Sequence, residues 1–481
     1  MMGMERVLVL KIAGEIGTKS ARTRRRFLRT LTGNVRAALR RAGVRAEIEP
    51  RWSRLLVRAE DHEAAGAAVG RVFGLHSVSD SAVVRFSSLG DLVGAAADVY
   101  RDRVAGRTFA VRARRSGQHP FRSTDVAVAL GDALRPVSSG VDLREPDVEV
   151  PLEIVEDTAY LFLERRPGAG GLPVGVGGRA VALFSGGFDS PVAAWMTMRR
   201  GMALELVTCD LGGCGQVDAA LEVARGLVSE WAPGIEPRAH VVDLAPAVAV
   251  LRARIESGIR QVVLKRAMYR AATIVAERVG AEALVTGEAL GQVSTQTVRN
   301  LAVAEDAAGL PVLRPLIGMD KEEILSRARD IGTHDASLRV QEHCDIASGR
   351  VETAARLRHV VNAEGRLDDW FVDDAARAAV EIDLTTWQPG PPPEHVLDAL
   401  PEAAVVVDIR EPEEGEPAAG DLRLPFSRVE EWVAGLEPGR TYVFVCTHGN
   451  RSEMVAHDLR RRGIDAYSLA GGIGRLPDRA A

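Results

Sequence analysis

The stretch that decides the fold is Ala180-Val-Ala-Leu-Phe-Ser-Gly-Gly-Phe-Asp-Ser-Pro-Val-Ala-Ala-Trp195. The apolar run at 181–184 predicts a buried parallel strand, and the segment from Ser190 predicts an amphipathic helix. Between them, Gly186 and Gly187 allow a positive φ and a close approach of the backbone to an anion. The free N–H groups and positive dipole end of the helix favour a phosphate at this turn. An ordinary strand-to-helix turn is the alternative interpretation.

The turn is not a Walker loop, because the spacing Gly-x-x-x-x-Gly-Lys-Ser/Thr is absent. Ser185-Gly-Gly-Phe-Asp-Ser190 instead resembles the pyrophosphate loop of enzymes that cleave ATP between its α and β phosphates. Strands and helices alternate beyond residue 178, which predicts a doubly wound parallel sheet. Ligands of such sheets bind beyond the carboxyl ends of the strands, where a second glycine turn, Val285 to Thr297, also lies.

Composition limits the class of protein. A chain of 481 residues should hold about three domains. No segment approaches the roughly 20 apolar residues of a membrane span, and residues 1–6 lack a signal-peptide core. We therefore expect a soluble, cytoplasmic protein with no membrane partner. The chain has four cysteines: Cys209, Cys214, Cys344 and Cys446. Their spacing matches neither a zinc site nor a disulfide framework, so each is either an inert core residue or a residue that takes part in a reaction.

Charge is unevenly distributed along the chain. Residues 1–60 contain fifteen Lys and Arg against five Asp and Glu, whereas residues 381–481 contain ten against eighteen. The segment 20–42 predicts a helix with one apolar face and many arginines, Arg24 and Arg25 among them. Such a face either serves solubility alone or contacts an RNA backbone, where arginines displace phosphate counterions.

The segment Thr108 to Asp125 predicts a strand, a basic glycine turn and a helix. Its pattern Phe-x-Val-Arg-x-Arg-Arg-x-Gly-x-His-x-Phe, followed by Val141 to Val150, resembles the THUMP domain of RNA-modifying enzymes. Charge alone predicts an anion patch, whereas the resemblance implies that the partner is tRNA. The patch comprises Arg112, Arg114, Arg115 and Arg122. His119 either stacks on RNA or caps the turn.

The last ninety residues predict a small α/β domain after a Pro-rich linker. Tyr442 to Ser452 places Cys446 at the end of a buried strand, in a glycine turn just before a helix. Backbone N–H groups and the helix dipole there stabilise a thiolate or persulfide. Together with Val405 to Glu413, the Cys-x-x-Gly-x-Arg-Ser loop resembles a rhodanese domain. A buried core cysteine and a phosphatase loop are the alternatives, although the spacing is one residue shorter than Cys-x5-Arg.

Together these regions resemble the tRNA 4-thiouridine synthetase family, also called tRNA sulfurtransferases and linked with thiamin biosynthesis, over essentially the whole chain. Lys11 to Lys19, Arg314 to Lys321 and Glu342 to Asp345 are similar to further family segments. The resemblance implies a multidomain α/β protein with a PP-loop, HUP-like adenylation domain. Its expected parts are a ferredoxin-like domain at 1–60, a THUMP domain at 61–167, the pyrophosphate-loop ATPase at 175–385, a linker at 386–394 and a rhodanese domain at 395–481.

The resemblance also implies the chemistry. Adenylation of uracil O4 by ATP makes a leaving group, and the loop holds the pyrophosphate that is released. Asp189 would bind Mg²⁺ or orient the phosphates, and Lys321 would neutralise charge at the α phosphate. A persulfide on Cys446 would supply sulfur, and Cys344 would release it through a disulfide. The expected nucleotide-binding residues are Leu183, Phe184, Ser185, Gly186, Gly187, Ser190, Lys265, Gly287 and Gln296.

The expected product is 4-thiouridine, at uridine 8 of tRNA. The implied partners are tRNA, a cysteine desulfurase, a thiol reductant and a thiamin sulfur-carrier protein. Three alternatives remain open: a sulfur relay serving mainly the thiazole of thiamin, a non-catalytic tRNA-binding module, and an amidating or NAD-synthetase-like enzyme. The last would leave Cys446 without a purpose.

Overall fold

The computed structural model describes residues 5–212, 215–340, 352–365, 372–390, 394–401, 403–415, 420–437, 439–447 and 449–476. The chain divides into two compact units. The first comprises Met1–Gly177, Met198–Ala203 and Glu230–Ile235, and the second comprises Gly178–Thr197, Leu204–Ser229 and Glu236–Ala481. None of the helices in the described ranges combines the length and the hydropathy that crossing a lipid bilayer requires.

The first unit is built on an eight-stranded sheet with the order β2-β3-β1-β4-β8-β7-β5-β6. Its first half contains β1 Arg6–Ile12, α1 Gly14–Gly17, α2 Ala21–Arg41, β2 Ala46–Pro50, β3 Arg54–Ala59, α3 His62–Gly70 and β4 Leu75–Arg85. Its second half contains α4 Leu89–Val104, β5 Thr108–Ser116, α5 Ser123–Leu134, the 3₁₀ turn Arg135–Val137, β6 Gly140–Val141, β7 Val148–Val155 and β8 Thr158–Pro167. The ferredoxin-like and THUMP α/β architecture expected from the sequence is confirmed.

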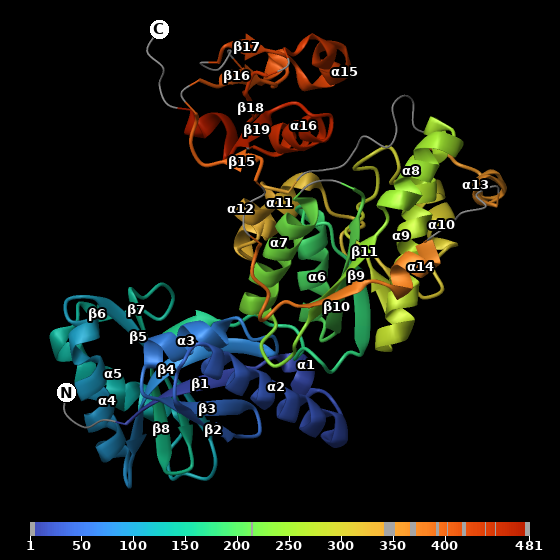
Figure 1. The fold of residues 1–481 in the computed structure, drawn as a ribbon. Helices are drawn as coiled ribbons and strands as arrows, with labels where there is room; N and C mark the ends of the chain where they lie inside the picture. The colour runs from blue at the N-terminus through green and yellow to red at the C-terminus, as the bar shows by residue number, and fades with distance from the viewer. Residues whose placement is uncertain are drawn as a thin grey trace. The chain divides into compact units, whose positions relative to one another are not determined.

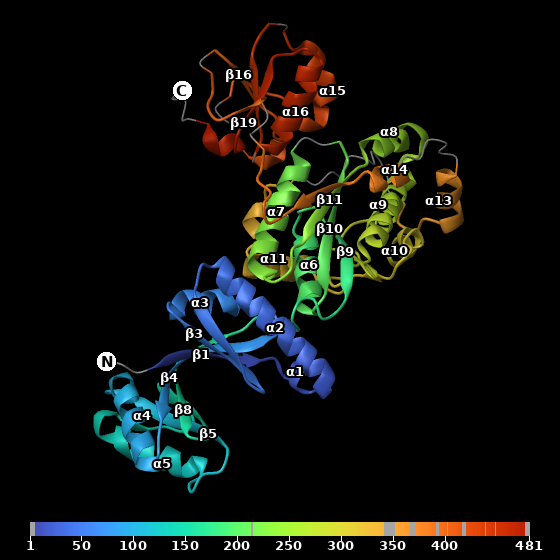
Figure 2. The ribbon, with the colours of Figure 1, turned by 60° about the horizontal axis from the view of Figure 1, so that its bottom comes forward.

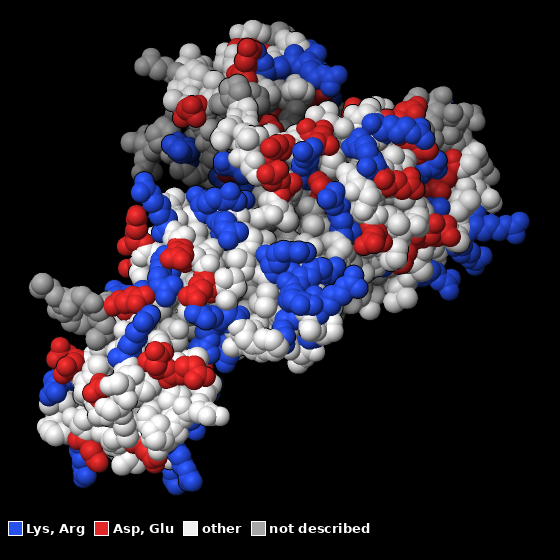
Figure 3. All heavy atoms as spheres, turned by 90° about the horizontal axis from the view of Figure 1, so that it is seen from below, with Lys and Arg blue, Asp and Glu red and all other residues white. Residues whose placement is uncertain are grey.

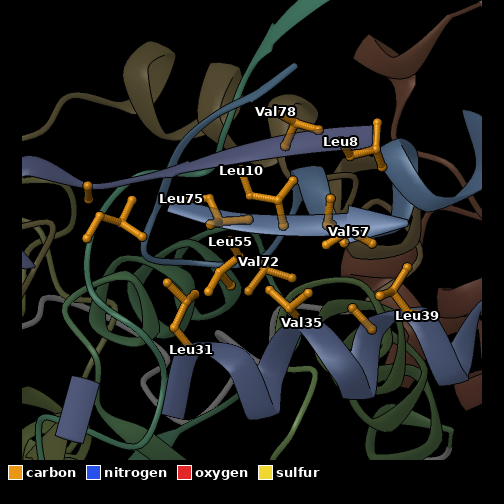
Figure 4. Packing of buried hydrophobic residues seen from close by; sticks show 14 of the residues in the cluster. Leu8, Leu10, Leu31, Val35, Leu39, Leu55, Val57, Val72, Leu75 and Val78 are labelled. Atoms are coloured by element: carbon orange, nitrogen blue, oxygen red, sulfur yellow. The ribbon is translucent and has the colours of Figure 1, made fainter. Parts of the chain in front are cut away.

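Helix α2 packs its apolar stripe on the sheet. Ser20 caps the helix by accepting a hydrogen bond from the Thr23 N–H. Leu31 and Val35, one turn apart on the stripe, are fully buried. Figure 4 shows these side chains directed at the leucines and valines of β1 and β3. The arginines occupy the remaining surface of α2, so a stable core and a basic outer face come from one helix.

Strand β4 joins the two halves of this sheet. It pairs antiparallel with β1 along one edge and with β8 along the other. Helix α3 and the first part of β4 lie in residues that the sequence assigned to the THUMP domain. Their side chains Val69 and Leu75 nevertheless pack in the core of the ferredoxin-like half. The two halves therefore share a strand, so the sheet has no break at residue 60.

The second unit contains a six-stranded sheet with the order β13-β12-β9-β10-β11-β14. Its elements are β9 Arg179–Leu183, α6 Asp189–Arg199, β10 Ala203–Asp210, α7 Gln216–Trp231, β11 Arg238–Asp243, α8 Ala245–Arg254, α9 Ser257–Val279, β12 Ala283–Val285, α10 Val298–Glu305, β13 Val312–Leu313, α11 Lys321–Asp330, α12 His334–Ser337, α13 Leu357–Glu364, α14 Val372–Arg377 and β14 Val380–Asp383. Strands β12 and β9 pair in parallel, as do β10 and β11.

Helices cover both faces of this sheet, as the sequence predicts. Figures 1 and 2 show α6 and α7 on one face and α9 and α10 on the other. The α9 face is filled largely by small residues such as Ala267, Ala271 and Ala272, which let the helix lie close to the strands. The sequence did not predict β14, which pairs antiparallel with β11 at the edge. An antiparallel edge strand is common on otherwise parallel sheets.

The C-terminal part of the second unit has its own five-stranded sheet with the order β15-β19-β18-β16-β17. Its elements are β15 Val396–Leu397, β16 Val405–Asp408, a 3₁₀ turn Pro412–Glu414, β17 Leu422–Arg423, a 3₁₀ turn Phe426–Arg428, α15 Val429–Trp432, a 3₁₀ turn Val433–Gly435, β18 Tyr442–Val445, α16 Asn450–Arg461, β19 Ala466–Leu469 and a 3₁₀ turn Gly472–Arg475. All its strand pairs are parallel. The helix expected near 426–435 is a short α-helix between two 3₁₀ turns.

Candidate active site

The Ser/Gly turn lies between β9 and α6, at the carboxyl end of the strand. The buried Ser190 hydroxyl accepts hydrogen bonds from the N–H groups of Ser185 and Gly186, each at 3.2 Å. The Gly187 N–H is 3.4 Å from the Ser185 Oγ. The loop amides therefore converge on hydroxyl oxygens, which shows that the turn is organised to surround oxygen acceptors at the start of a helix.

Gly186 is required by both its conformation and its surroundings. Its φ is +80°, and a Cβ there would lie 2.7 Å from the Ala220 Cα. The same Cβ would lie 3.1 Å from a methyl group of Val340. The chain that follows α12 therefore passes beside the loop at Val340, four residues before Cys344 in the sequence.

The carboxylate of Asp189, at the first position of α6, joins three separate segments. Lys321 Nζ lies 3.2 Å from Asp189 Oδ1. The Gln292 amide donates to Asp189 Oδ2 at 2.9 Å. Lys321 Nζ also lies 5.4 Å from the centre of the Phe188 ring. The structure thus places an ammonium, a carboxylate and an amide side by side at the end of the Ser/Gly turn.

Lys321 begins α11, a position that disfavours a cation. Asp320 caps this helix by accepting from the Glu323 N–H, and the Glu323 carboxylate accepts from the Asp320 N–H. This capping box, predicted from the sequence, fixes the helix start without using Lys321. The Lys321 side chain remains 40% exposed while paired with Asp189, so it is accessible to an anion in the site.

Behind the loop, Glu288 is the centre of a buried polar network. Only 7% of the residue is exposed. Its carboxylate accepts from Lys265 at 2.9 Å, Arg314 at 3.0 Å and Thr286 at 3.1 Å, and also from the Tyr269 hydroxyl. Burial alone would raise the pKa of Glu288, but Lys265, Tyr269 and Arg314 lower that pKa below its ordinary value. The carboxylate is therefore charged and holds the Lys265 ammonium.

The remaining nucleotide residues expected from the sequence are distributed around the same strand ends. A Cβ on Gly287 would lie 2.8 Å from the Asp189 carbonyl carbon and from the Ser190 nitrogen, so glycine is needed there. Gln296 is 9% exposed, and within the described part of the chain its Oε1 has no hydrogen-bond donor. Leu183 is half-buried, but the Phe184 ring is in the core at 2% exposure. Only the backbone of Phe184 can therefore border a ligand.

In the C-terminal sheet, Cys446 follows β18 and is 2% exposed. Its Sγ is 3.6 Å from the Ser452 hydroxyl of α16. Gly449 caps α16 with a φ of +98°, and a Cβ there would meet the backbone of Gly471 at 3.2 Å. The thiol thus lies in a tight glycine turn at a helix N-terminus, as the sequence predicts.

Glu414 closes this turn from the opposite loop. Arg451 donates to its carboxylate at 2.7 Å, and the Thr447 hydroxyl donates at 3.2 Å. The hydrogen bond from Arg451 is the main cause that lowers the pKa of Glu414 to about 2. Arg451, which the sequence places at the helix start, is therefore held in position by a charged partner.

The arginines expected to contact RNA lie in the first unit. Arg25, Arg112, Arg114 and Arg122 are exposed, whereas Arg24 and Arg115 are half-buried. Arg112 pairs with Glu149 at 3.2 Å. His119 is bonded to the Glu156 carbonyl at 2.6 Å and to Arg115 at 3.0 Å, so it braces the THUMP turn.

Several predicted residues fall elsewhere. Cys344 and Cys214 lie outside the described residues. Cys209 packs against the core, and burial raises the pKa of its thiol to about 12, which agrees with an inert role. The described ranges contain no group of three or more His, Cys, Asp and Glu residues that could hold a metal ion.

Family models match three successive parts of the chain: the ThiI ferredoxin-like domain at residues 7–79, the THUMP domain at 86–164, and Thiamine biosynthesis protein (ThiI) at 175–368. The tRNA sulfurtransferase of Desulfurococcus amylolyticus is 39% identical over 473 residues, which cover 97% of each chain. The chain belongs to the ThiI family of tRNA sulfurtransferases. The family match over 97% of the chain includes most of the C-terminal sheet with Cys446.

Two further family members are similar over a large part of the chain. The tRNA sulfurtransferase of Pectobacterium atrosepticum is 35% identical over 95% of this chain and 98% of its own. A solved 4-thiouridine synthetase, crystallised with RNA and bound ATP, has a TM-score of 0.70 and 29% identity. It covers 78% of this chain and 99% of its own.

The sequence analysis missed Glu288, Gln292 and Tyr269 as parts of the site. Composition supports the two lysines that the sequence analysis did predict. Only four of the 61 Lys and Arg residues are lysines, and Lys265 and Lys321 are two of them. A chain that uses arginine almost everywhere retains lysine at these two points, where a compact ammonium suits a crowded site. Glu288 gives no such signal, because its partners come from distant segments.

Proposed function

We propose that this chain is an ATP-dependent tRNA sulfurtransferase that activates a uridine, at position 8, and replaces its O4 by sulfur from a cysteine persulfide. The proposal rests on the pairing of Asp189 and Lys321 at the mouth of the Ser/Gly loop. Membership of the ThiI family supports tRNA and ATP as substrates.

The strand ends suit ATP in three respects. The loop amides converge on hydroxyl oxygens, where phosphate oxygens would take their place. The buried Gln296 Oε1, which lacks a donor within the described ranges, can accept from an amino group such as that of adenine. Gly287 leaves room for the backbone of Asp189 and Ser190 to lie close to a ligand.

In the first half-reaction, uridine O4 attacks the α phosphorus of ATP and pyrophosphate leaves. Lys321 donates to the α phosphate and neutralises the negative charge that grows on it. Asp189 orients that ammonium before the nucleotide binds. Mg²⁺ fits here with one carboxylate, Asp189, and phosphate oxygens as ligands, and it would supply further charge neutralisation. The Ser/Gly loop retains the pyrophosphate.

In the second half-reaction, the terminal sulfur of a Cys446 persulfide attacks C4 of the activated base, and O4 departs on AMP. The Cys344 thiolate then attacks Cys446 Sγ, so a disulfide forms and the transferred sulfur stays on C4. Two electrons pass from the two cysteine thiols to that sulfur. An external thiol reductant then reduces the disulfide back to two thiols. A cysteine desulfurase reloads Cys446.

The position of Val340 supports the role of Cys344. Val340 borders Gly186 of the loop, and four residues of chain reach at most about 14 Å. In the sequence, the Pro-rich stretch from Thr385 to Glu394 separates this domain from the one that carries Cys446, and the proposal requires the two to come together.

A sulfur relay that serves mainly the thiazole of thiamin is the second candidate function, because the matching family model bears the description Thiamine biosynthesis protein. A non-catalytic tRNA-binding module is disfavoured, since Asp189, Lys321, Cys344 and Cys446 are all retained. A deletion strain distinguishes the tRNA sulfurtransferase from the sulfur relay for thiazole. The first function predicts loss of thiolated tRNA, and the second predicts thiamin auxotrophy.

The proposal is tested with the full chain, ATP, Mg²⁺, unmodified tRNA and a sulfur donor, with near-ultraviolet absorbance of thiouridine as the readout. Cys446→Ala should abolish product from a persulfide donor and retain much of the product from free sulfide. Asp189→Ala should abolish both. Equal activity of Asp189→Ala and the wild type would contradict the proposed role of the loop.

A further inference from the structure

The β2–β3 hairpin ends in an exposed tryptophan. Strand β2 ends at Pro50 and β3 begins at Arg54, and the Arg51 N–H donates to the Arg54 carbonyl at 2.9 Å. Trp52 lies at the tip and is 73% exposed, more than any other large hydrophobic residue in the described ranges. Single exposed apolar residues are common on protein surfaces, so exposure alone identifies no site.

A second residue, from a different element, completes the arrangement. The Arg24 guanidinium lies over the Trp52 ring, 3.3 Å from the ring centre. Arg24 is three residues before Phe27 and seven before Leu31, so it lies on the same side of α2 as the buried stripe, in the first turn of the helix. Helix α2, which carries Arg24, and strand β3, which follows the turn that carries Trp52, pack in one core (Figure 4). The two members of the stacked pair are therefore attached to elements of the same core.

The surroundings of this pair are strongly basic. Helix α2 contains eight arginines and no acidic residue. Arg25 and Arg51, the chain neighbours of the stacked pair, are both exposed, and Arg51 also pairs with Glu49 of β2. Figure 3 shows a dense group of Lys and Arg side chains on the face it presents. A surface of this kind attracts polyanions and repels cationic ligands.

We propose that Trp52 and Arg24 form a stacking site for an unpaired base of the bound RNA, an inference that rests on the proposed tRNA substrate. The guanidinium covers one face of the indole, and the 73% exposure leaves the other face to a base. Stacking on an aromatic ring accepts any base, since every base has a π face. The neighbouring arginines bind the flanking phosphates.

The proposed stacking site predicts that changes in tRNA affinity and changes in its salt dependence come from different residues. Trp52→Ala should weaken tRNA binding about 5- to 100-fold while the slope of log Kd against log salt stays unchanged, because no phosphate contact is lost. Trp52→Phe, which keeps a π face, should restore most of that affinity. Arg25→Ala, the matched control, should instead reduce the slope by about one. Circular dichroism and the melting temperature check that each variant folds.

Inorganic polyphosphate and polyglutamate serve as probes without bases. Trp52→Ala should bind both as tightly as the wild type does. A Trp52→Ala variant that binds tRNA like the wild type would overturn the stacking site. So would an equal loss of polyglutamate binding, which would indicate a surface for acidic proteins. Absence of tRNA binding by the wild type itself would instead contradict the proposed function.

Discussion

Lys321 Nζ and Asp189 Oδ1 lie 3.2 Å apart although 132 residues separate them in the chain. The first residue of α6 and the first residue of α11 thus meet at one edge of the parallel sheet. This edge is where ligands of doubly wound sheets bind. A carboxylate and an ammonium on two helix starts, beside a glycine loop, form the site that we propose for the polyphosphate of ATP.

Replacing Lys321 by alanine should lower the rate of tRNA thiolation about 100- to 1,000-fold, the effect of removing one donor to transition-state charge. The melting temperature should change little, because an exposed ion pair contributes about 0–1 kcal/mol. Single-turnover kinetics with saturating tRNA measure the rate. Lys321→Arg keeps the charge but changes its geometry, so an intermediate rate is expected. Retention of more than a tenth of the wild-type rate by Lys321→Ala would exclude this role.

Glu288→Gln should destabilise the second unit by about 3 kcal/mol, because Lys265 and Arg314 lose their buried counter-charge. Glu305→Gln is the matched control. Glu305 pairs with the same Arg314 at 2.6 Å but is 44% exposed, so its loss should cost under about 1 kcal/mol. Urea denaturation followed by circular dichroism compares the two. Equal destabilisation by both variants would contradict the central position of Glu288.

The Glu414–Arg451 pair should make the C-terminal sheet sensitive to acid. Arg451 holds the pKa of Glu414 at about 2 in the folded state, against an ordinary value of 4.5. A lowered folded pKa adds stability above pH 4.5, and that stability is lost as the pH falls toward 2. Glu414→Gln should therefore be less stable than the wild type at pH 7, and this difference should shrink as the pH falls from 4.5 toward 2. A difference that is constant between these pH values would refute the assignment.

Leu31→Ala should destabilise the first unit by about 2–5 kcal/mol, since Leu31 is fully buried between α2 and the sheet. Leu28→Ala, at a half-buried position on the same helix, is the control and should cost less. Differential scanning calorimetry of the full chain measures both. Because Arg24 is carried by the same helix, a destabilised α2 should also weaken tRNA binding near the melting transition.

Local sequence signals were sufficient for most elements of the fold. The alternation of strands and helices from residue 178 predicted the doubly wound sheet, and Asp320 with Glu323 predicted the start of α11. The edge strand β14 was missed because four residues with mixed character have no clear period. The shared strand β4 was missed because a sequence gives no sign of which edges a strand uses.

Part of the candidate site could likewise be predicted from the sequence, and part could not. The Ser/Gly loop could be predicted because its glycines and hydroxyls are consecutive in the chain. The network around Glu288 could not, since Lys265, Tyr269 and Arg314 reach it from α9 and from the segment before α11. The stacked pair of Arg24 and Trp52 depends on where the first turn of α2 lies relative to the hairpin, which only tertiary packing determines.

Transfer of oxygen from the base to AMP tests base activation most directly. The wild-type chain is incubated with ATP, a sulfur donor and tRNA whose target uridine carries ¹⁸O at O4, and the AMP is examined by mass spectrometry. Attack of O4 on the α phosphorus predicts one ¹⁸O in AMP for every 4-thiouridine formed. Formation of 4-thiouridine with unlabelled AMP would contradict activation of the base by adenylation.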